Sequence, residues 1–214
     1  TNTIGTCLIL DALKSLKKRI NVVLITSDKV YENKEWIWGY RENDQLGGKD
    51  PYSCSKAMAE MGIKSYLSTY DYLNNGVKIA IGRAGNVIGG GDWSEKRIIP
   101  DAMRAWSKNK SLELRNPLAT RPWQHVLEPL SGYIQFAKLL NSNNDLHGEA
   151  FNFGPLPDQN YSVNTLIQEM SKHWENVSWK VIDKNIEQFH EAGLLKLNCD
   201  KALKHLKWKS TLNF

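Results

Sequence analysis

Long hydrophobic runs and patterned metal ligands are both missing from this sequence. No stretch approaches the length that crosses a bilayer, so a membrane protein is not expected. The cysteines lack metal-site spacing, which predicts reduced thiols in a cytoplasmic protein; they are Cys7, Cys54 and Cys199. The histidines lack ligand-like spacing as well, and we therefore predict no metal site. They are His125, His147, His173, His190 and His205.

Charge of one sign is not concentrated on one predicted surface. The net charge is +5, but the lysines are scattered and aromatic residues are not interleaved with basic ones. Nucleic-acid binding is therefore the weakest alternative. A solvated surface with a few arginines reserved for an anionic small molecule is favoured. With 214 residues, 41% of them apolar, the chain can form one core, or a core and a smaller lobe.

The glycine-rich fingerprint of dinucleotide-binding folds, Gly-x-Gly-x-x-Gly, is also absent. Yet helix patterns over 2–18 and 50–72 alternate with strand patterns over 21–26 and 77–83. This alternation predicts an α/β fold with a Rossmann-like, doubly wound parallel sheet. Either the fold binds no nucleotide, or the first half of the sheet is missing from this sequence. We favour the second explanation, because a complete helix begins at once with no strand ahead of it.

The pattern changes after residue 92, where we expect a smaller α/β lobe that binds the substrate and returns in places to the main sheet. The predicted domains are 1–92 and 93–214. Short strands are expected over 112–114 and 150–153, with a loop over 116–122. Helices are expected over 98–108, 129–140, 162–174 and 201–206, the last capped by Asp200. The expected apolar face of helix 129–140 comprises Leu130, Tyr133, Ile134, Ala137 and Leu140.

Tyr52 and Lys56 are the strongest candidates for catalysis. Their spacing places both on one face of a helix, where an ammonium group lowers the pKa of a nearby phenol. Such a phenol can take a proton from a sugar hydroxyl. Upstream, a buried β-branched run ends in Ser27, Asp28 and Lys29, as is typical of a strand that opens into an active site. The alternative is an ordinary helix pair that faces the core.

A second group of polar residues indicates a binding loop. Arg83 and Asn86 flank a strand end, and the glycines at 89–91 allow the backbone to approach a ligand closely. The alternative is a flexible connection between lobes. Arg121 can hold a phosphate through two parallel hydrogen bonds, or it is an ordinary surface arginine. Arg97 and Arg115 have the same two interpretations.

With these motifs in place, the chain resembles the extended short-chain dehydrogenase/reductase family from about residue 2 to residue 155. Within that family it is most similar to the dehydratases that act on CDP-glucose. The strings that carry the resemblance are TSDKVYENKEW at 26–36, GYREND at 39–44, RAGNVIGGGDW at 83–93, RNP at 115–117 and RPWQHVLEPLSGY at 121–133.

The resemblance implies a lyase that uses tightly held NAD. C4 of the glucosyl unit is oxidised, water is lost across C5 and C6, and the hydrogen taken from C4 returns to C6. Tyr52 is then the base and Lys56 tunes it, Ser27 hydrogen-bonds the C4 oxygen, and Asp28 protonates the leaving hydroxyl. Lys29 stands where related dehydratases have a glutamate base. It is either the C5 base, with a depressed pKa, or an electrostatic stabiliser of an enolate.

The resemblance also assigns binding roles. It implies that Asn86 lies at the sugar diphosphate, that Arg121 holds a phosphate, and that Arg97 and Asn116 lie near the nucleotide. Asn2 is expected to order the active site beside the cofactor. The implied partners are CDP-glucose and a second copy of the chain, which forms a homodimer through helices 2–18 and 51–72. The implied pathway makes dideoxyhexoses for bacterial lipopolysaccharide O-antigen.

Two other readings stay open. An epimerase of the same fold needs Tyr52 and Lys56 but no acid at position 28. A non-catalytic remnant binds a nucleotide sugar, or a partner subunit through an exposed sheet edge. Because NAD would lie mainly on the absent half of the sheet, we expect the 214-residue chain alone to bind NAD poorly and to turn over little.

Overall fold

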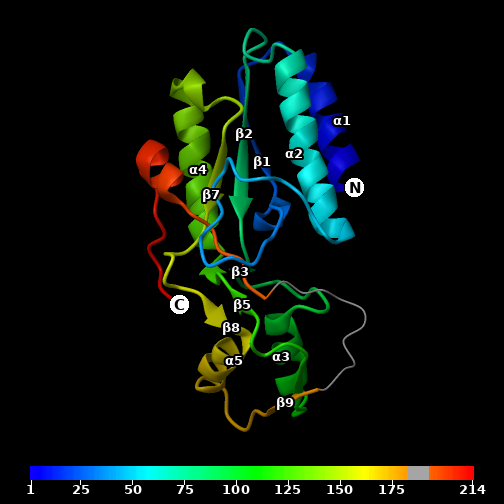
Figure 1. Ribbon diagram of the computed structural model, residues 1–214, viewed down its shortest axis with the longest axis vertical. Coiled ribbons are helices and arrows are strands. Elements are labelled where there is room, and N and C mark those ends of the chain that lie inside the picture. The colour runs from blue at the N-terminus through cyan, green and yellow to red at the C-terminus, as the bar shows by residue number, and fades with distance from the viewer. Residues whose placement is uncertain (183–192) are drawn as a thin grey trace.

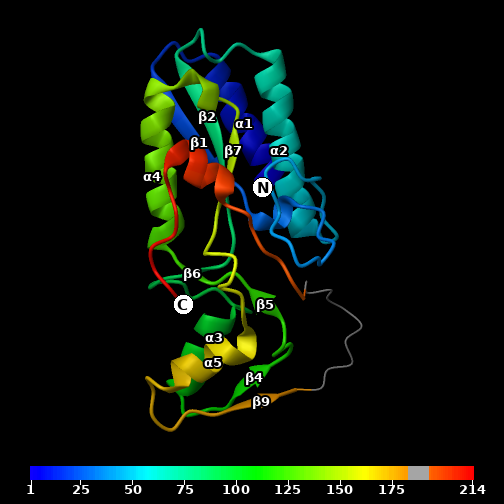
Figure 2. The same ribbon diagram turned by 60° about the vertical axis from the view of Figure 1, so that its left-hand side comes forward.

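The computed structural model describes residues 1–182 and 193–214, so His190 lies outside the described residues. Its main sheet has three parallel strands in the order β1-β2-β7. Helices α1 and α2 cover one face and α4 covers the other (Figures 1 and 2). This arrangement confirms the predicted α/β fold with a Rossmann-like sheet. The bounds are α1 Asn2–Lys14, β1 Ile20–Ile25, α2 Pro51–Thr69, β2 Val77–Ala84, α4 Leu127–Ser142 and β7 Ala150–Phe153.

Strand β2 runs through the middle of this sheet and is buried on both faces. Ile79 belongs to one apolar cluster with Leu10 of α1 and Ile63 of α2. Ala80, the next residue, belongs to a second cluster with Phe136 of α4. Alternate side chains of a strand point to opposite faces, so a strand between two helical layers must be apolar almost throughout. The β-branched sequence of β2 follows from this position.

Both α1 and α2 end before the predicted residues 18 and 72. The Asn75 side chain donates a hydrogen bond of 3.0 Å to the carbonyl oxygen of Lys14 and so closes α1. Tyr72 is buried, and its hydroxyl donates to the Leu10 carbonyl at 2.9 Å. To bring Tyr72 inward the chain leaves the helical conformation at Tyr70. Tertiary contacts, and not helix propensity, therefore determine where α1 and α2 end.

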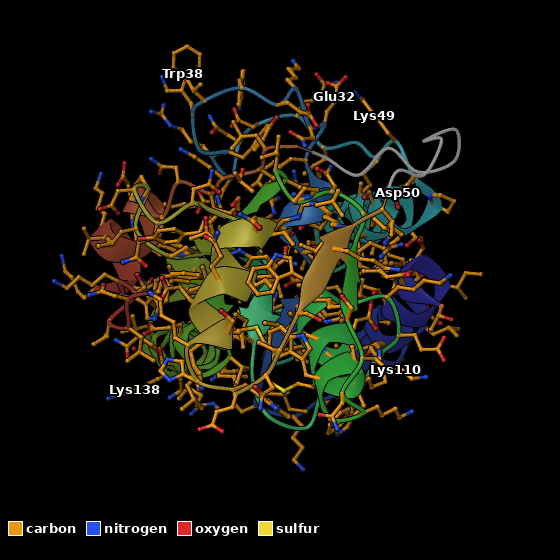
Figure 3. The ribbon with its side chains drawn as sticks, turned by 90° about the horizontal axis from the view of Figure 1, so that it is seen from below. Glu32, Trp38, Lys49, Asp50, Lys110 and Lys138 are labelled. Carbon is orange, nitrogen blue, oxygen red and sulfur yellow. The ribbon has the colours of Figure 1, made fainter. Side chains whose placement is uncertain are left out.

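A long loop joins β1 to α2 and packs partly into the interior. Tyr31 and Tyr40 are both buried and stack with ring centroids 5.0 Å apart. Trp38 is 68% exposed and points away from the body of the molecule at its rim (Figure 3). The loop is thus anchored by its tyrosines, while its tip is solvated.

The second lobe lies beyond the carboxyl ends of the main strands (Figure 1). Trp106, Leu114 and Ile167 form its core, and three pairs of short strands surround them. The chain returns to the main sheet with α4 and β7, while the exact boundary at residue 92 stays a prediction. The bounds are β3 Val87–Ile88, α3 Ile98–Trp106, β4 Leu112–Leu114, β5 Thr120–Arg121, β6 Gln124–His125, β8 Tyr161–Ser162, α5 Val163–Ser171 and β9 Trp179–Val181.

The buried face of α4 agrees with the predicted one at Leu140 and Tyr133 but differs at other positions. Leu130 and Ile134 are 42% and 71% exposed, whereas Gly132, Phe136 and Leu140 are buried. A side chain at position 132 would place its Cβ 2.3 Å from the Phe153 ring, so the glycine lets α4 approach the sheet closely. The close approach at Gly132 places the face of α4 that bears Phe136 against the sheet. The hydrophobic pattern of the sequence alone does not distinguish this face from the one that bears Leu130 and Ile134.

The last helix is a short π-helical turn, and Asp200 does not cap it as predicted. The Asp200 carboxylate accepts a hydrogen bond from the Asn198 side chain instead. Among the described residues, no helix is long and apolar enough to span a membrane. The remaining short helices are the 3-10 turns η1 Asp28–Val30 and η2 Asn144–Leu146 and the π turn η3 Ala202–Leu206.

Candidate active site

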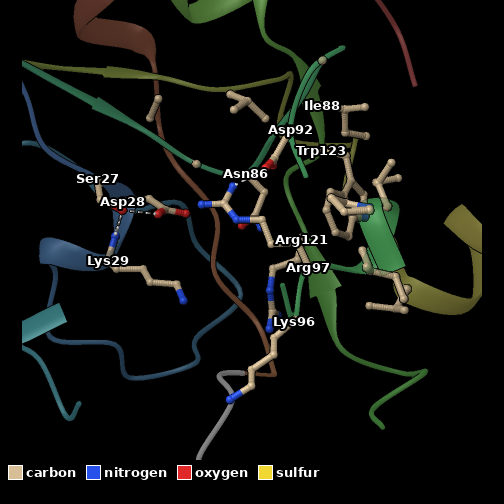
Figure 4. Close-up of a pocket in the computed structure, with 18 of the residues that line it drawn as sticks. Ser27, Asp28, Lys29, Asn86, Ile88, Asp92, Lys96, Arg97, Arg121 and Trp123 are labelled. Atoms are coloured by element: carbon tan, nitrogen blue, oxygen red, sulfur yellow. Dashed lines mark hydrogen bonds and ion pairs between the residues drawn. The ribbon is translucent and has the colours of Figure 1, made fainter. Parts of the chain in front are cut away.

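The carboxyl ends of β1 and β2 open into a cavity of about 470 Å³, and the second lobe forms its opposite wall (Figure 4). The sheet side contributes Ser27, Asp28, Lys29 and Tyr52. Open α/β sheets bind ligands at this end of their strands, because the connecting loops gather polar groups there. The cavity therefore brings together most of the residues expected to act in catalysis.

The Ser27–Lys29 segment is held by its own hydrogen bonds. The Ser27 hydroxyl accepts from the Lys29 backbone at 3.2 Å and donates to Asp28 Oδ1 at 3.0 Å. Asp28 is only 4% exposed. Burial raises the pKa of Asp28 to about 6, although the Ser27 hydrogen bond and the charges of Lys29 and Arg121 oppose this rise. A carboxyl group with this pKa can donate a proton near neutral pH.

The backbone beside Asp28 leaves little room for another side chain. A Cβ at Gly85 would lie 3.1 Å from Asp28 Oδ2 and 3.0 Å from Pro122 Cγ. Because Gly85 has no side chain, the Asp28 carboxylate can lie against the backbone that directly follows β2.

Tyr52 lies in the first turn of α2, where the Asp50 side chain caps the helix by accepting from the Tyr52 and Ser53 amides at 2.9 and 3.1 Å. The Tyr52 side chain is 48% exposed and lines the cavity. Lys29 Nζ lies 5.8 Å from the centre of the Tyr52 ring. The phenol and the Ser27–Lys29 segment thus share one end of the cavity.

Lys56 and Asn2 lie behind this end and do not line the cavity. The Lys56 ammonium donates to the carbonyl oxygen of Ile25, the last residue of β1, at 3.4 Å. The Asn2 amide donates to the Ser55 hydroxyl at 3.0 Å, which ties α1 to the helix turn that bears Lys56. The structure therefore places Asn2 as a support of α2.

The opposite wall of the cavity is rich in cationic and amide groups. Asn86, Arg97, Asn116 and Arg121 all line it, as the predicted binding roles require. Arg121 is 8% exposed and donates to the Thr120 carbonyl at 2.7 Å, whereas exposed Arg97 pairs with Asp92 at 3.2 Å. Sequence reasoning missed Lys96, Trp123 and Tyr133, which also line the cavity. In the sequence, the position of Lys96 beside Arg97, shortly after the glycines at 89–91, was a signal that Lys96 also lines the site.

Arg83 does not lie in the cavity, contrary to its predicted role in substrate binding. Its side chain is fully buried and forms an ion pair with Glu60 of α2. It also donates to the Tyr31 hydroxyl at 2.8 Å and to the Glu42 carbonyl at 3.0 Å. These partners hold Arg83 inside the fold, so the role of Arg83 is structural. In residues 1–182 and 193–214, no group of three or more histidine, cysteine or acidic side chains is placed to hold a metal ion.

Comparison with known proteins identifies a family and a relative that matches most of this chain. A family model described as GDP-mannose 4,6 dehydratase matches residues 1–214. CDP-glucose 4,6-dehydratase of Salmonella typhimurium is 45% identical over 213 residues, which cover 97% of this chain and 59% of the relative. The chain thus spans about three fifths of that relative's length.

Solved structures share the fold at lower identity. UDP-glucuronic acid 4-epimerase of Bacillus cereus, in complex with UDP-glucuronic acid and NAD, superposes with a TM-score of 0.81 at 18% identity, covering 100% of this chain and 63% of that one. The dTDP-glucose 4,6-dehydratase of Bacillus anthracis, in complex with NAD, gives 0.76 at 23% identity, covering 100% and 64%. These likenesses show a Rossmann-like fold.

Proposed function

The chain belongs to the GDP-mannose 4,6 dehydratase family, and from this premise we propose that it carries the catalytic residues of an enzyme converting CDP-glucose to CDP-4-keto-6-deoxyglucose and water. The relative that is 45% identical supports CDP-glucose as the substrate. The observation that carries the proposal is the meeting of a buried acid, Asp28, and an exposed phenol, Tyr52, in one cavity with an arginine-rich wall.

NAD fits one end of this cavity. Tyr52 is half exposed at the carboxyl edge of the sheet and lines the cavity, where its phenol can hold a ribose hydroxyl, and Lys56 lies behind it at the end of β1. Asn2 supports them through Ser55. When bound, NAD would accept the hydride from C4 of the sugar and return it to C6, so that the reaction has no net redox change. The sequence has no Gly-x-Gly-x-x-Gly turn for the pyrophosphate, so these residues account for the nicotinamide end of the cofactor.

The side chains divide the proton transfers between them. Tyr52 takes the proton from the C4 hydroxyl, and Ser27 hydrogen-bonds the C4 oxygen. The resulting carbonyl acidifies the C5 proton. Asp28 gives its proton to the C6 oxygen, which leaves as water when the C5 proton is removed. Lys29 faces the same end of the cavity as Tyr52, and it acts either as the C5 base or as a stabiliser of the enolate.

The second lobe binds the nucleotide in this proposal. Arg121 holds a phosphate in this proposal, because the charge of a nearly buried guanidinium is little screened. Asn86 lies at the sugar diphosphate, while Arg97 and Asn116 lie toward the nucleotide.

We also propose a homodimer formed through α1 and α2. Apart from Tyr52, five large apolar side chains on these helices are exposed by 46% to 69%: Ile4, Leu8, Ile9, Met58 and Met61. Exposed apolar side chains that gather on one face mark a protein interface. Sedimentation of an Ile4→Glu/Met61→Glu variant tests this, and a dimer that persists unchanged would contradict it. A cytoplasmic location and a role in dideoxyhexose supply for O-antigen belong to the same proposal and rest on the resemblance alone.

The proposed reaction is tested by mass spectrometry of the product formed from CDP-glucose and NAD by the full-length gene product. We expect the loss of one water and a 4-keto-6-deoxy sugar nucleotide. A product of unchanged mass, epimerised at C4, would replace the dehydratase with an epimerase. Absence of any reaction by a folded protein would indicate a protein that only binds the nucleotide sugar.

A further inference from the structure

Two side-chain hydrogen bonds in the described part of the chain join residues 25–29 to helix α2. One is the 3.4 Å contact of Lys56 Nζ with the Ile25 carbonyl. The other is shorter: the Thr26 hydroxyl donates to Glu60 Oε1 at 2.6 Å. Thr26 directly precedes the Ser27–Lys29 segment, and Glu60 lies about two turns beyond Tyr52 on α2. The Thr26–Glu60 bond therefore connects the element holding the acid to the helix holding the phenol.

Glu60 is itself held rigidly. It is fully buried, and Arg83 Nε donates to its two carboxylate oxygens at 2.8 and 3.1 Å. Arg83 in turn donates to the Tyr31 hydroxyl, which donates to Asn152 of β7 at 2.7 Å. A buried ion pair is stable only when its geometry is closely satisfied, so each partner has little freedom to move. Thr26 is thus bonded to a fixed point in the interior.

We propose that Thr26 is a positioning residue whose hydroxyl, through Glu60, fixes the separation between Asp28 and Tyr52. This inference rests on the proposed function. Removing the hydroxyl leaves the Arg83–Glu60 pair intact, because that pair has its own hydrogen bonds. What is lost is the shorter of the two hydrogen bonds between the strand end and α2, so the acid and the phenol gain freedom to move relative to each other while the nucleotide-binding wall is untouched.

The test compares Thr26→Val, which keeps the shape without the hydroxyl, with Thr26→Ser, which keeps the hydroxyl, in the full-length gene product. We expect Thr26→Val to lower kcat for CDP-glucose by about 10- to 100-fold with KM nearly unchanged, since a displacement near 1 Å can cost about 100-fold. Thr26→Ser should retain kcat within about 3-fold. Thr165→Val is the matched control: Thr165 is also half-buried and hydrogen-bonded by its hydroxyl, but it does not line the cavity.

A second readout does not depend on turnover. Amide hydrogen exchange at residues 27–30 should accelerate in Thr26→Val, remain as in the native protein in Thr26→Ser, and stay unchanged in α4 and β7. If Thr26→Val fails to fold, Thr26→Ala removes the same hydroxyl without adding a methyl group in its place, and the same split is expected.

Three results would overturn the proposal: retained kcat with protected amides in the valine and alanine variants, an equal loss of kcat in Thr26→Ser, or a change in KM alone. If the native protein does not convert CDP-glucose, the proposed function fails, and the exchange comparison still decides whether Thr26 links the strand end to α2.

Discussion

The two walls of the cavity hold their polar groups in different ways. On the sheet side, Asp28 is 4% exposed and the supporting Arg83–Glu60 pair is fully buried. On the lobe side, Arg121 is also buried at 8% exposure, but the Arg97 side chain is 60% exposed and its partner Asp92 is 34% exposed. Buried charges interact strongly and depend on fixed geometry, whereas exposed charges are screened by salt. The sheet-side wall is thus suited to hold reacting groups at fixed distances, whereas the exposed charges of the lobe-side wall are suited to attract an anion.

The largest effect is expected from Asp28→Asn, which removes the proton donor while keeping the size of the side chain. In a dehydratase, kcat should fall by about 100- to 10,000-fold, because the leaving hydroxyl loses its general acid. Binding of CDP-glucose, measured by calorimetry, should change little. Retained turnover with a C4 epimer as product would mean that the sheet-side acid is not needed.

The next effect concerns stability. Glu60→Gln leaves the buried Arg83 charge uncompensated, and the free energy of unfolding should fall by about 3–5 kcal/mol. Asp92→Asn breaks an exposed pair and should cost no more than about 1 kcal/mol. Urea unfolding measures both. Equal losses of unfolding free energy in the two variants would contradict the proposed difference between the two walls.

The pKa of Asp28 predicts how stability varies with pH. Its folded pKa of about 6 lies above the ordinary value of 3.8. Between these values the folded state holds a proton that the unfolded state has released, so this group's contribution to stability is lost as pH rises from 3.8 to 6. The loss is about 3 kcal/mol for a shift of about two units. Asp28→Asn should remove it, so stability curves that run parallel in both proteins over this range would contradict a buried acid.

The smallest effect is expected on the lobe side. Arg97→Ala should raise KM for CDP-glucose about 5-fold at low salt and less at high salt, because exposed ion pairs contribute up to about 1 kcal/mol. Lys138→Ala on α4 is the control, since it removes a cation at the rim of the molecule that does not line the cavity (Figure 3). A salt-independent change in KM would show that Arg97 acts by packing and not by charge.

The catalytic candidates could be predicted because the information lies within short segments. The Tyr52–Lys56 spacing and the polar end of a β-branched run need no knowledge of distant contacts. Arg83 could not be placed, because its partner Glu60 lies 23 residues away on a different element, and no local pattern reveals that they meet. The buried face of α4 was partly missed for a similar reason, since contact between Gly132 and Phe153 decides it.

The narrow space at Gly85 has a consequence for protein engineering. Its neighbours are the carboxylate of Asp28 and the ring of Pro122, and a proline ring cannot swing aside as a long flexible side chain can. A side chain at this position would therefore press on the Asp28 carboxylate. In a library that encodes all amino acids at this position and is selected for turnover, we expect glycine to dominate the survivors.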